Sequence, residues 1–359
     1  MPIDVPRTLR SADDIVGAGL ATAEHLPELE AVAARYAVAI TPAMTELIVP
    51  GDADDPIGRQ FIPEAAELDG SPEESADPIG DDEHSPVPGI VHRYPDRVLL
   101  KPLHACPVYC RFCFRREMVG PSGLGSLSQI ETEAALAYIK SHPEIWEVVV
   151  TGGDPLILSP RRLRDLMKSL GQIDHVRVIR FHTRVPVVAP DLVSEELVAA
   201  LRVEPSRAVF VVLHANHARE LTPAARDACG RLVDAGIPML SQSVLLRGVN
   251  DEPTALDALL RALVEARIKP YYLHHPDLAL GTGHFRLSLS RGQDLMRNLR
   301  GRISGLCQPT YVLDLPGGYG KVPVGPCYVK QVDGAADATG RCRIEDPSGR
   351  LHDYPDRRG

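Results

Sequence analysis

The 359-residue sequence lacks three features that would assign it to large functional classes. It has no run of ~18 apolar residues, the minimum for a membrane-spanning helix. Its net charge of −9 argues against binding to a nucleic-acid backbone, which depends on clustered lysine and arginine. The amino-terminal stretch has no basic segment followed by an apolar core, so it predicts no secretory signal. We therefore expect a cytoplasmic protein that binds neither nucleic acid nor a membrane.

Cysteine is sparse outside one short segment. In a reducing cytosol we expect the scattered cysteines to be free thiols rather than a disulfide framework. Three of the seven cysteines fall within eight residues, Cys106-Pro-Val-Tyr-Cys110-Arg-Phe-Cys113, directly after the apolar run 97–103. The scattered cysteines are Cys229, Cys307, Cys327 and Cys342.

Three thiols so close together indicate a metal centre. A structural zinc site normally has four protein ligands, often as two CxxC pairs, and no second pair lies nearby. Three thiolates on a four-iron cluster would instead leave one iron open to an external ligand. Two alternatives stay open at this stage: His104 completes a zinc site, or the thiols bind no metal. The Cys-x3-Cys-x2-Cys spacing after a first strand resembles the cluster loop of radical S-adenosylmethionine (SAM) enzymes.

The chain before the cysteines divides into two parts. Residues 1–48 mix apolar and polar stretches that suit short helices, which we interpret as an accessory layer. Residues 51–89 are rich in proline and glycine and contain twelve Asp or Glu against one Arg. This composition predicts an extended, irregular connection.

From residue 97 onward, strand-like and helix-like segments alternate. Helix starts are indicated by a capping box at Ser128 and by Ser159-Pro160 and Thr222-Pro223. Six β/α units imply a parallel sheet with right-handed crossovers, but they are too few for an eightfold barrel. We therefore predict an α/β fold built on a partial (βα)6 TIM-like barrel. The expected strands are 97–103, 146–151, 175–182, 208–213, 238–245 and 269–273.

Polar residues fall at the carboxyl ends of these strands, where such folds place their active sites. After the second strand, Gly152 and Gly153 would let backbone groups approach a ligand, although an ordinary turn would also use them. Each of the other polar residues alone is explained by capping or core packing. Polar groups at successive strand ends instead indicate one pocket. They are His182, Thr183, Arg184, His214, Asn216, His217 and Gln242.

A glycine-rich segment, Asp314-Leu-Pro-Gly-Gly-Tyr-Gly-Lys321, lies near the end of the chain. It does not fit a phosphate loop, because Leu315 stands where the first glycine is needed and Val322 where a Ser or Thr is needed. A lysine in such a turn is either solvated or able to form an imine with pyridoxal phosphate (PLP).

Several motifs together resemble the lysine 2,3-aminomutase family over roughly residues 40–326. The resemblance implies a radical SAM enzyme that binds a [4Fe–4S] cluster, SAM and PLP. It also implies an N-terminal accessory region (1–90), a radical SAM partial barrel (91–300) and a C-terminal PLP-lysine segment (301–359). The motifs are Arg93-Tyr-Pro-Asp-Arg97, the cysteine loop with Phe114-Arg115-Arg116, Thr151-Gly-Gly-Asp-Pro155, Gln242-Ser-Val-Leu-Leu-Arg-Gly-Val-Asn250, Asp277 with His284-Phe-Arg286, and Pro316-Gly-Gly-Tyr-Gly-Lys321.

The same resemblance implies roles for individual residues. Lys321 is the residue expected to bind PLP, and Arg115 the one expected to bind the substrate α-carboxylate. Asp277 and Asp314 match the carboxylates that receive a side-chain ammonium, although one could simply cap a helix and the other start a turn. The expected cluster ligands are Cys106, Cys110 and Cys113. The other expected cofactor contacts are Arg93, Tyr94 and Arg97 near the PLP phosphate, and Gly152, Gly153, Asp154, His214 and Gln242.

The implied reaction moves the α-amino group of free L-lysine to the β-carbon, with electrons from a flavodoxin- or ferredoxin-type reductant. A homo-oligomer is expected. One alternative acts on a lysine of elongation factor P, and another is a non-enzymatic iron–sulfur or zinc protein. The sequence departs from the family pattern at His274, where an aromatic residue is expected near PLP. It also departs in its tail, which has only Cys342 where zinc-binding members carry a cysteine cluster.

Overall fold

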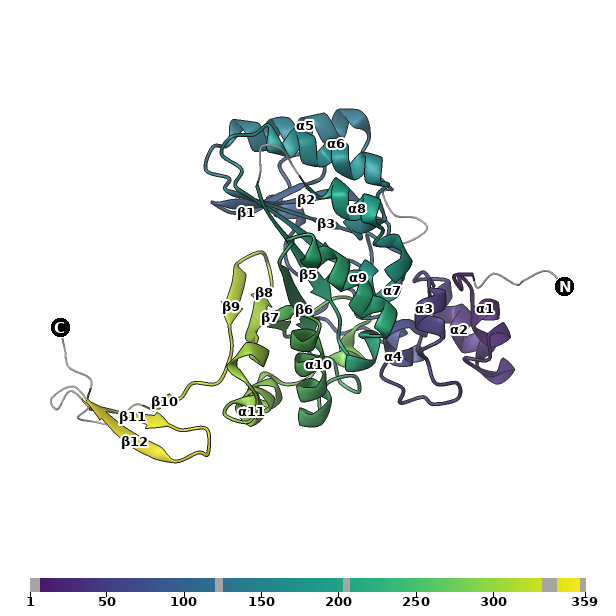
Figure 1. The fold of residues 1–359 in the computed structure, drawn as a ribbon. Coiled ribbons are helices and arrows are strands. Elements are labelled where there is room, and N and C mark those ends of the chain that lie inside the picture. Colours follow the sequence, from purple (N-terminus) through teal and green to yellow (C-terminus); the bar gives the residue numbers. More distant parts are fainter. Residues whose placement is uncertain (1–6, 120–124, 203–206, 331–340, 356–359) are drawn as a thin grey trace.

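The computed structural model describes residues 7–119, 125–202, 207–330 and 341–355. The amino-terminal stretch 1–6, on which the absence of a signal was argued, lies outside them, as do 331–340 and 356–359 of the tail. One curved sheet organises the chain, with its nine strands in sequence order (Figure 1). Its strands are β1 (Ile90–Tyr94), β2 (Arg97–Leu103), β3 (Glu147–Gly152), β4 (Val178–Thr183), β5 (Ala208–His214), β6 (Met239–Val244), β7 (Ile268–His274), β8 (Thr310–Leu315) and β9 (Gly320–Pro323).

Strands β2 to β8 are parallel, and β1 and β9 pair antiparallel at the two edges. The six predicted strands, which correspond to β2 through β7, are confirmed. The β8–β9 hairpin was not predicted as strands, because its central residues are proline and glycine. Lys321 therefore lies on β9, opposite Asp314 of β8, and not in a turn. Residues 310–323 belong to the same sheet as the other barrel strands. The domain boundary expected at residue 300 therefore separates strands of one sheet.

Helices follow the parallel strands along the outside of the sheet (Figure 1). Local signals fix their starts, as predicted: the Ser128 side chain accepts from the Glu131 N–H, while the Glu131 carboxylate accepts from the Ser128 N–H at 2.8 Å. The helices are α1 (Ala12–Gly17), α2 (Leu26–Ala33), α3 (Pro42–Thr45), α4 (Gly58–Phe61), α5 (Gln129–Ser141), α6 (Pro160–Gly171), α7 (Val185–Val188), α8 (Glu195–Ala200), α9 (Pro223–Asp234), α10 (Pro253–Glu265) and α11 (Leu289–Leu299). Short 3₁₀-helices are η1 (Ala23–His25), η2 (Ala65–Leu68), η3 (Asp82–His84), η4 (Pro155–Ile157), η5 (Pro190–Leu192), η6 (Ala218–Glu220), η7 (Gly283–Phe285) and η8 (Gly305–Cys307).

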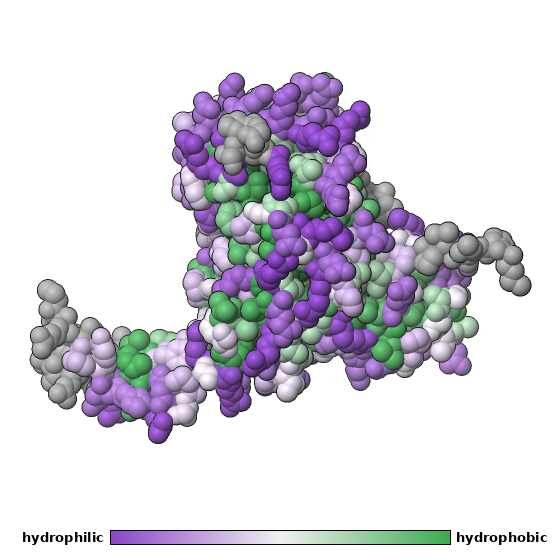
Figure 2. Space-filling view, in the orientation of Figure 1, coloured by the Kyte–Doolittle hydropathy of each residue, from purple (hydrophilic) through white to green (hydrophobic). Residues whose placement is uncertain are grey.

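The hydrophobic core lies between this sheet and its helices. Val148 and Val150 of β3 are fully buried, as are Leu163 and Leu170 on the inner face of α6. A strand covered on both sides is apolar throughout, which is why β3 reads as a continuous valine run. The outward faces of α5 and α6 are hydrophilic in Figure 2.

The acidic connection 51–89 differs from its prediction. It contains α4, η2 and η3, and several of its acids are buried ion-pair partners of arginines in the barrel. Composition cannot distinguish a solvated acidic segment from one whose charges are paired across the fold. The pairs are Asp55 with Arg219, Glu67 with Arg111 and Arg116, Glu74 with Arg286, and Asp81 with Arg93 and Arg115.

The two edge strands of the sheet meet at one point. The backbone N–H of Lys321 on β9 donates to the hydroxyl of Tyr94 on β1 at 2.7 Å. Gly320 allows this approach, since a Cβ there would lie 3.1 Å from the Tyr94 oxygen and its φ of 93° disfavours other residues. The nine-stranded sheet is thus nearly closed, and Lys321 lies where its edges meet.

A separate three-stranded antiparallel sheet projects from the barrel on the side away from the N-terminal helices (Figure 1). Within the described ranges, no helix is both long and apolar enough to cross a membrane. The strands of the small sheet are β10 (Val329–Lys330), β11 (Arg341–Glu345) and β12 (Leu351–Pro355).

Candidate active site

The three clustered cysteines lie in the loop after β2 and are only partly buried. Burial raises the pKa of all three thiols, that of Cys113 to about 11. The charge of Cys110 further raises the pKa of Cys106 and Cys113, whereas Arg184 opposes the shift at Cys110. Thiols kept neutral by burial ionise when a bound metal supplies positive charge. In the part of the chain that is described, no three His, Cys, Asp or Glu side chains lie close enough to bind a single metal ion. A four-iron cluster has no such requirement, because each thiolate binds a different iron.

Two glycines at the end of β3, Gly152 and Gly153, hold the cysteine loop against the sheet. A Cβ on Gly153 would overlap the Ala105 carbonyl group, and Gly152 has a φ of 107°. The N–H of Gly153 donates to the Leu103 carbonyl at 2.8 Å, and that of Asp154 donates to the Ala105 carbonyl at 2.9 Å. The glycines therefore permit a close approach of two backbones beside Cys106.

The Asp154 carboxylate joins the ends of β3 and β4. Its Oδ1 accepts from Thr183 Oγ1 at 2.7 Å and from the Leu156 N–H at 3.1 Å, and its Oδ2 from the N–H groups of Arg184 and Val185 at 2.6 and 3.1 Å. Burial raises the pKa of Asp154, and these hydrogen bonds oppose the shift. All four acceptor positions of the carboxylate are filled by protein donors.

A buried ion-pair network holds the cysteine loop in place through Arg111 and Arg116. Arg111, between Cys110 and Cys113, is fully buried and donates from Nε to both oxygens of Glu67 at 2.8 and 3.0 Å. Arg116 also contacts Glu67, and its guanidinium lies 3.5 Å from the centre of the Tyr36 ring. Glu67, from the acidic connection, therefore compensates two arginine charges around the loop.

Three further polar residues lie at the ends of adjacent strands. His214 of β5 stacks on Phe112 of the cysteine loop with ring centres 5.5 Å apart, and it is the register partner of Gln242 on β6. Burial lowers the pKa of His214 and of His182 on β4 well below the ordinary histidine value, so both rings are neutral near pH 7. The Nε2 atom of each histidine is buried and has no hydrogen-bond partner among the residues that the structure describes.

Lys321 extends from β9 over the ends of β7 and β8. Its Nζ contacts the Asp314 carboxylate and lies 3.3 Å from His274 Nδ1 and 5.6 Å from the centre of the Tyr272 ring. A second carboxylate, Asp277, follows β7, and the charges of Asp314 and Lys321 both affect its pKa. Lys321, Asp314 and Asp277, which are up to 44 residues apart in sequence, are thus brought near one another.

The two carboxylates have opposite electrostatic environments. Burial, followed by the negative charge of Asp314, raises the pKa of Asp277 to about 7, although Lys321, Arg115 and Arg93 oppose the shift. Burial would also raise the pKa of Asp314, but the hydrogen bond with His274 and the charge of Lys321 hold it well below its usual value. Asp314 is therefore ionised, and Asp277 gains or loses its proton near neutral pH.

Cations gather at the other end of the pocket around one carboxylate, Asp81. Arg115 donates to Asp81 Oδ2 from Nε and Nη2 at 3.0 and 2.8 Å, and Arg93 donates to Oδ1 at 3.1 Å. The buried amine of Lys101 lies 3.9 Å from Oδ2. Sequence reasoning missed Asp81 and Lys101, since no local pattern distinguishes them from other charged residues. Three cations around one anion leave an excess of positive charge, which suits anionic ligand groups.

Tyr94 at the end of β1 and Arg97 at the start of β2 lie near these arginines, at one edge of the sheet. The Arg97 guanidinium stacks 3.9 Å from the centre of the Tyr94 ring and pairs with Asp96 at 2.7 Å. The Tyr94 hydroxyl contacts Lys321 as described above. Tyr94 therefore contacts Lys321 directly, and Arg97 is linked to Lys321 only through the Tyr94 ring.

Several buried polar atoms in this region lack partners within the described part of the chain. An unpaired buried polar group costs ~1–3 kcal/mol, so such atoms indicate a ligand that completes the site. The donor set fits the implied cofactors, with soft thiols for iron, cations for phosphate and carboxylate, and an amine for an aldehyde. The atoms are Nε2 of His182, His214 and His274, Nε of Arg93 and Oδ1 of Asp277.

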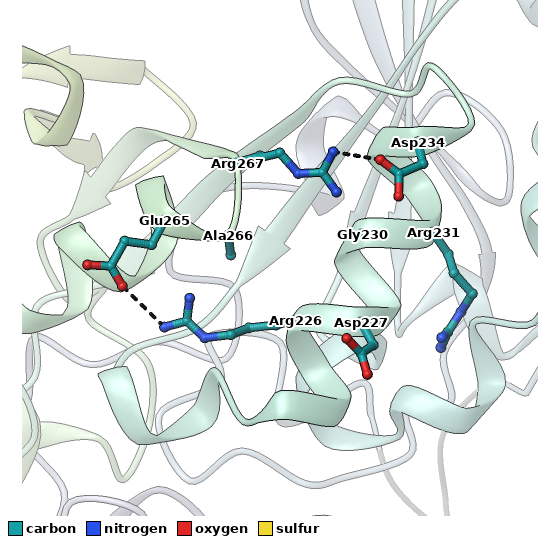
Figure 3. A pocket seen from close by; sticks show the side chains of 8 residues that line it. All are labelled: Arg226, Asp227, Gly230, Arg231, Asp234, Glu265, Ala266 and Arg267. Atoms are coloured by element: carbon teal, nitrogen blue, oxygen red, sulfur yellow. Dashed lines mark hydrogen bonds and ion pairs between the residues drawn. The ribbon is translucent and has the colours of Figure 1, made fainter.

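A hollow of about 440 Å³ lies elsewhere, between α9 and α10 on the outer surface (Figure 3). Four of its charged side chains pair with one another, Arg267 with Asp234 at 2.6 Å and Arg226 with Glu265 at 3.6 Å. None of the residues expected to carry chemistry lines this hollow.

The barrel, the cysteine loop and the polar strand ends define a radical SAM enzyme. Residues 100–260 match the radical SAM superfamily domain, and residues 296–335 match the lysine-2,3-aminomutase domain. The chain is 44% identical to L-lysine 2,3-aminomutase of Clostridium subterminale over 292 residues, which cover 81% of this chain and 70% of that protein. It belongs to the lysine 2,3-aminomutase family.

Two other relatives show the breadth of that family. The putative L-lysine 2,3-aminomutase of Aquifex aeolicus is 43% identical over 83% of this chain and 80% of its own length. Glutamate 2,3-aminomutase of Clostridioides difficile is 36% identical over 84% of this chain and 70% of its own. Family membership makes the protein a radical SAM isomerase and implies a [4Fe–4S] cluster, SAM and PLP. The alternative of a non-enzymatic metal protein is therefore excluded.

Proposed function

We propose that this enzyme converts free L-lysine to β-lysine by moving the amino group from the α- to the β-carbon. The observation that carries the proposal is the position of Asp277 and Asp314 beside Lys321. Two carboxylates suit a substrate side chain that ends in an ammonium. A glutamate side chain would instead add repulsion, since like charges ~4 Å apart cost ~4 kcal/mol at an effective dielectric constant of ~20.

Cys106, Cys110 and Cys113 would hold the cluster, and Lys321 would hold PLP. When bound, the cluster and SAM would supply a 5′-deoxyadenosyl radical, and PLP would carry the migrating amino group. The protein's own contribution is to place these groups and to exclude water. Arg115 would bind the α-carboxylate through its planar fork, and Arg93 with Tyr94 and Arg97 would bind the PLP phosphate.

Asp81 and Lys101 would support the anion-binding end of the pocket. Asp81 orients Arg115 and Arg93 and compensates part of their charge. Lys101 adds a third cation near Arg115, which favours a carboxylate there. Orientation by a buried carboxylate leaves the arginines fewer alternative conformations, so less entropy is lost when ligands bind.

His214, Gln242 and the backbone of Gly152 and Gly153 would hold SAM next to the cysteine loop. Asp154 would act as a positioning residue, because its oxygens are already occupied by protein donors. We also propose an external one-electron reductant of flavodoxin or ferredoxin type and a homo-oligomer.

The deciding experiment is product identification. Anaerobically reconstituted enzyme with SAM, PLP and dithionite would be incubated separately with L-lysine, L-glutamate and elongation factor P, and products identified by mass spectrometry. We expect β-lysine from free lysine alone. Activity confined to elongation factor P, or to glutamate, would contradict the proposal.

A further inference from the structure

His274, the last residue of β7, lies beside both Lys321 and Asp314. Its Nδ1 atom is 3.3 Å from Lys321 Nζ and 3.5 Å from Asp314 Oδ2, and Lys321 contacts Asp314 directly. The three side chains come from the neighbouring strands β7, β8 and β9. They form a triangle in which an amine, an imidazole and a carboxylate each touch the other two.

The surroundings keep this imidazole neutral and poised to accept a proton. The groups that face it are Tyr272 on its own strand, with rings 5.7 Å apart, Lys321 and Asp314. The charge that His274 carries when protonated lowers the pKa of His182 on β4 and of His214 on β5. Burial, then the Lys321 charge, lowers the pKa of His274, and Asp314 opposes the shift.

We propose that His274 accepts the proton that Lys321 must lose before it can bind PLP. This inference rests on the proposed role of Lys321. In the starting arrangement the Lys321 ammonium donates to Asp314 and to the lone pair on His274 Nδ1. Transfer of one proton to Nδ1 leaves a neutral amine and an imidazolium, whose new N–H faces the Asp314 carboxylate.

The covalent step balances with no further reactant. The Nζ lone pair of Lys321 forms a bond to the aldehyde carbon of PLP, and the carbonyl oxygen leaves as water with the two hydrogens that remained on Nζ. The third proton stays on His274 or returns to the nitrogen of the new carbon–nitrogen double bond. No electrons are gained or lost.

Asp314 is the weaker candidate for this role. It contacts Lys321 as well, but a carboxylate is ordinarily a weaker base than an imidazole, and its environment lowers its pKa further, so it binds a proton poorly. Its task here is to stabilise the imidazolium. Once Lys321 is neutral, Asp314 loses its cationic partner and becomes available to the substrate ammonium.

The test measures PLP loading and not turnover. PLP would be added to PLP-free enzyme in a stopped-flow instrument, and the absorbance change on bonding to Lys321 followed from acidic pH, below the ordinary histidine pKa, up to pH 10. Because the pKa of His274 is lowered, the wild-type rate should be level around neutral pH and fall only on the acidic side, as His274 gains a proton. In His274→Asn it should be at least ~10-fold lower at pH 7, within the range for general base catalysis, and keep rising with pH as hydroxide takes over.

Two variants separate proton transfer from a structural role. In His274→Ala, imidazole added to the buffer should restore the loading rate in proportion to its neutral form. His275→Asn is the matched control, because His275 is a buried neighbour that bonds Tyr311 Oη at 2.7 Å, not Lys321. Its loading rate should match the wild type.

Wild-type loading rates and pH profiles in both His274 variants would overturn the inference, as would a lowered rate that neither pH nor imidazole restores. Failure of the proposed function gives a different result. If borohydride reduction of the wild type places no pyridoxyl group on Lys321, the role of Lys321 itself is wrong.

Discussion

The carboxylate of Asp81 accepts two hydrogen bonds from Arg115, at 3.0 and 2.8 Å. Asp81 also binds Arg93, so one acidic residue sets the positions of the arginines assigned to the substrate and to the PLP phosphate. The roles of both arginines therefore depend on the same buried charge.

For Asp81→Asn we predict lower stability and weaker substrate binding, because the buried cations lose their counter-charge. Removing one partner of a buried pair costs ~3–5 kcal/mol.

Burial would raise the Asp81 pKa, but Arg115 and Lys101 hold it below the unfolded value. Its contribution to stability is therefore present above pH ~4 and lost as the pH falls below that value. Urea unfolding at pH 7 and the KM for lysine measure both effects, and the exposed Asp82→Asn is the control. An unchanged unfolding midpoint would contradict the prediction.

Gly153→Ala should prevent proper placement of the cysteine loop, because the added methyl group overlaps the Ala105 carbonyl. We expect iron and sulfide contents after anaerobic reconstitution to fall to less than half of the wild-type values. Gly70→Ala, where no atom lies within 4 Å of the new Cβ, is the control and should retain its cluster. Full iron content in Gly153→Ala would show that the loop has space to move.

Lysine binding should strengthen as the pH rises, because burial and the charge of Asp314 raise the pKa of Asp277, and Asp277 must be ionised to receive an ammonium. Asp277→Asn should remove this pH dependence and lower activity by orders of magnitude while iron and PLP contents persist. Calorimetric titration of lysine into the PLP-loaded enzyme between pH 6 and 8.5 provides the measurement. A pH-independent affinity in the wild type would rule out Asp277 as the titrating ligand.

Glu67→Gln should destabilise the protein by ~3–5 kcal/mol, because Arg111 and Arg116 remain buried with their charges uncompensated. Since Arg111 lies between two cysteines, cluster loading should fall as well. Thermal unfolding and iron analysis would be compared with the exposed Glu83→Gln. Wild-type stability in Glu67→Gln would mean that the arginines find other partners.

The sequence by itself determined the strands and helices of the barrel, and it predicted which three cysteines hold the cluster. These depend on local patterns: valine runs, capping residues such as Ser128 and Glu131, and three cysteines within eight residues. The β8–β9 hairpin was missed because proline and glycine dominate its turn, and only the neighbouring strand β7 identifies β8 as part of the sheet.

Only the tertiary structure decided how the charges are paired. Glu67 and Arg111 are 44 residues apart, and His274 and Lys321 are 47 residues apart. The energy of a charge depends on its burial and on the few ångströms around it, and neither can be read from neighbours in sequence. The acidic connection therefore resembled a solvated segment in the sequence, whereas the fold buries four of its carboxylates, those of Asp55, Glu67, Glu74 and Asp81, against arginines of the barrel.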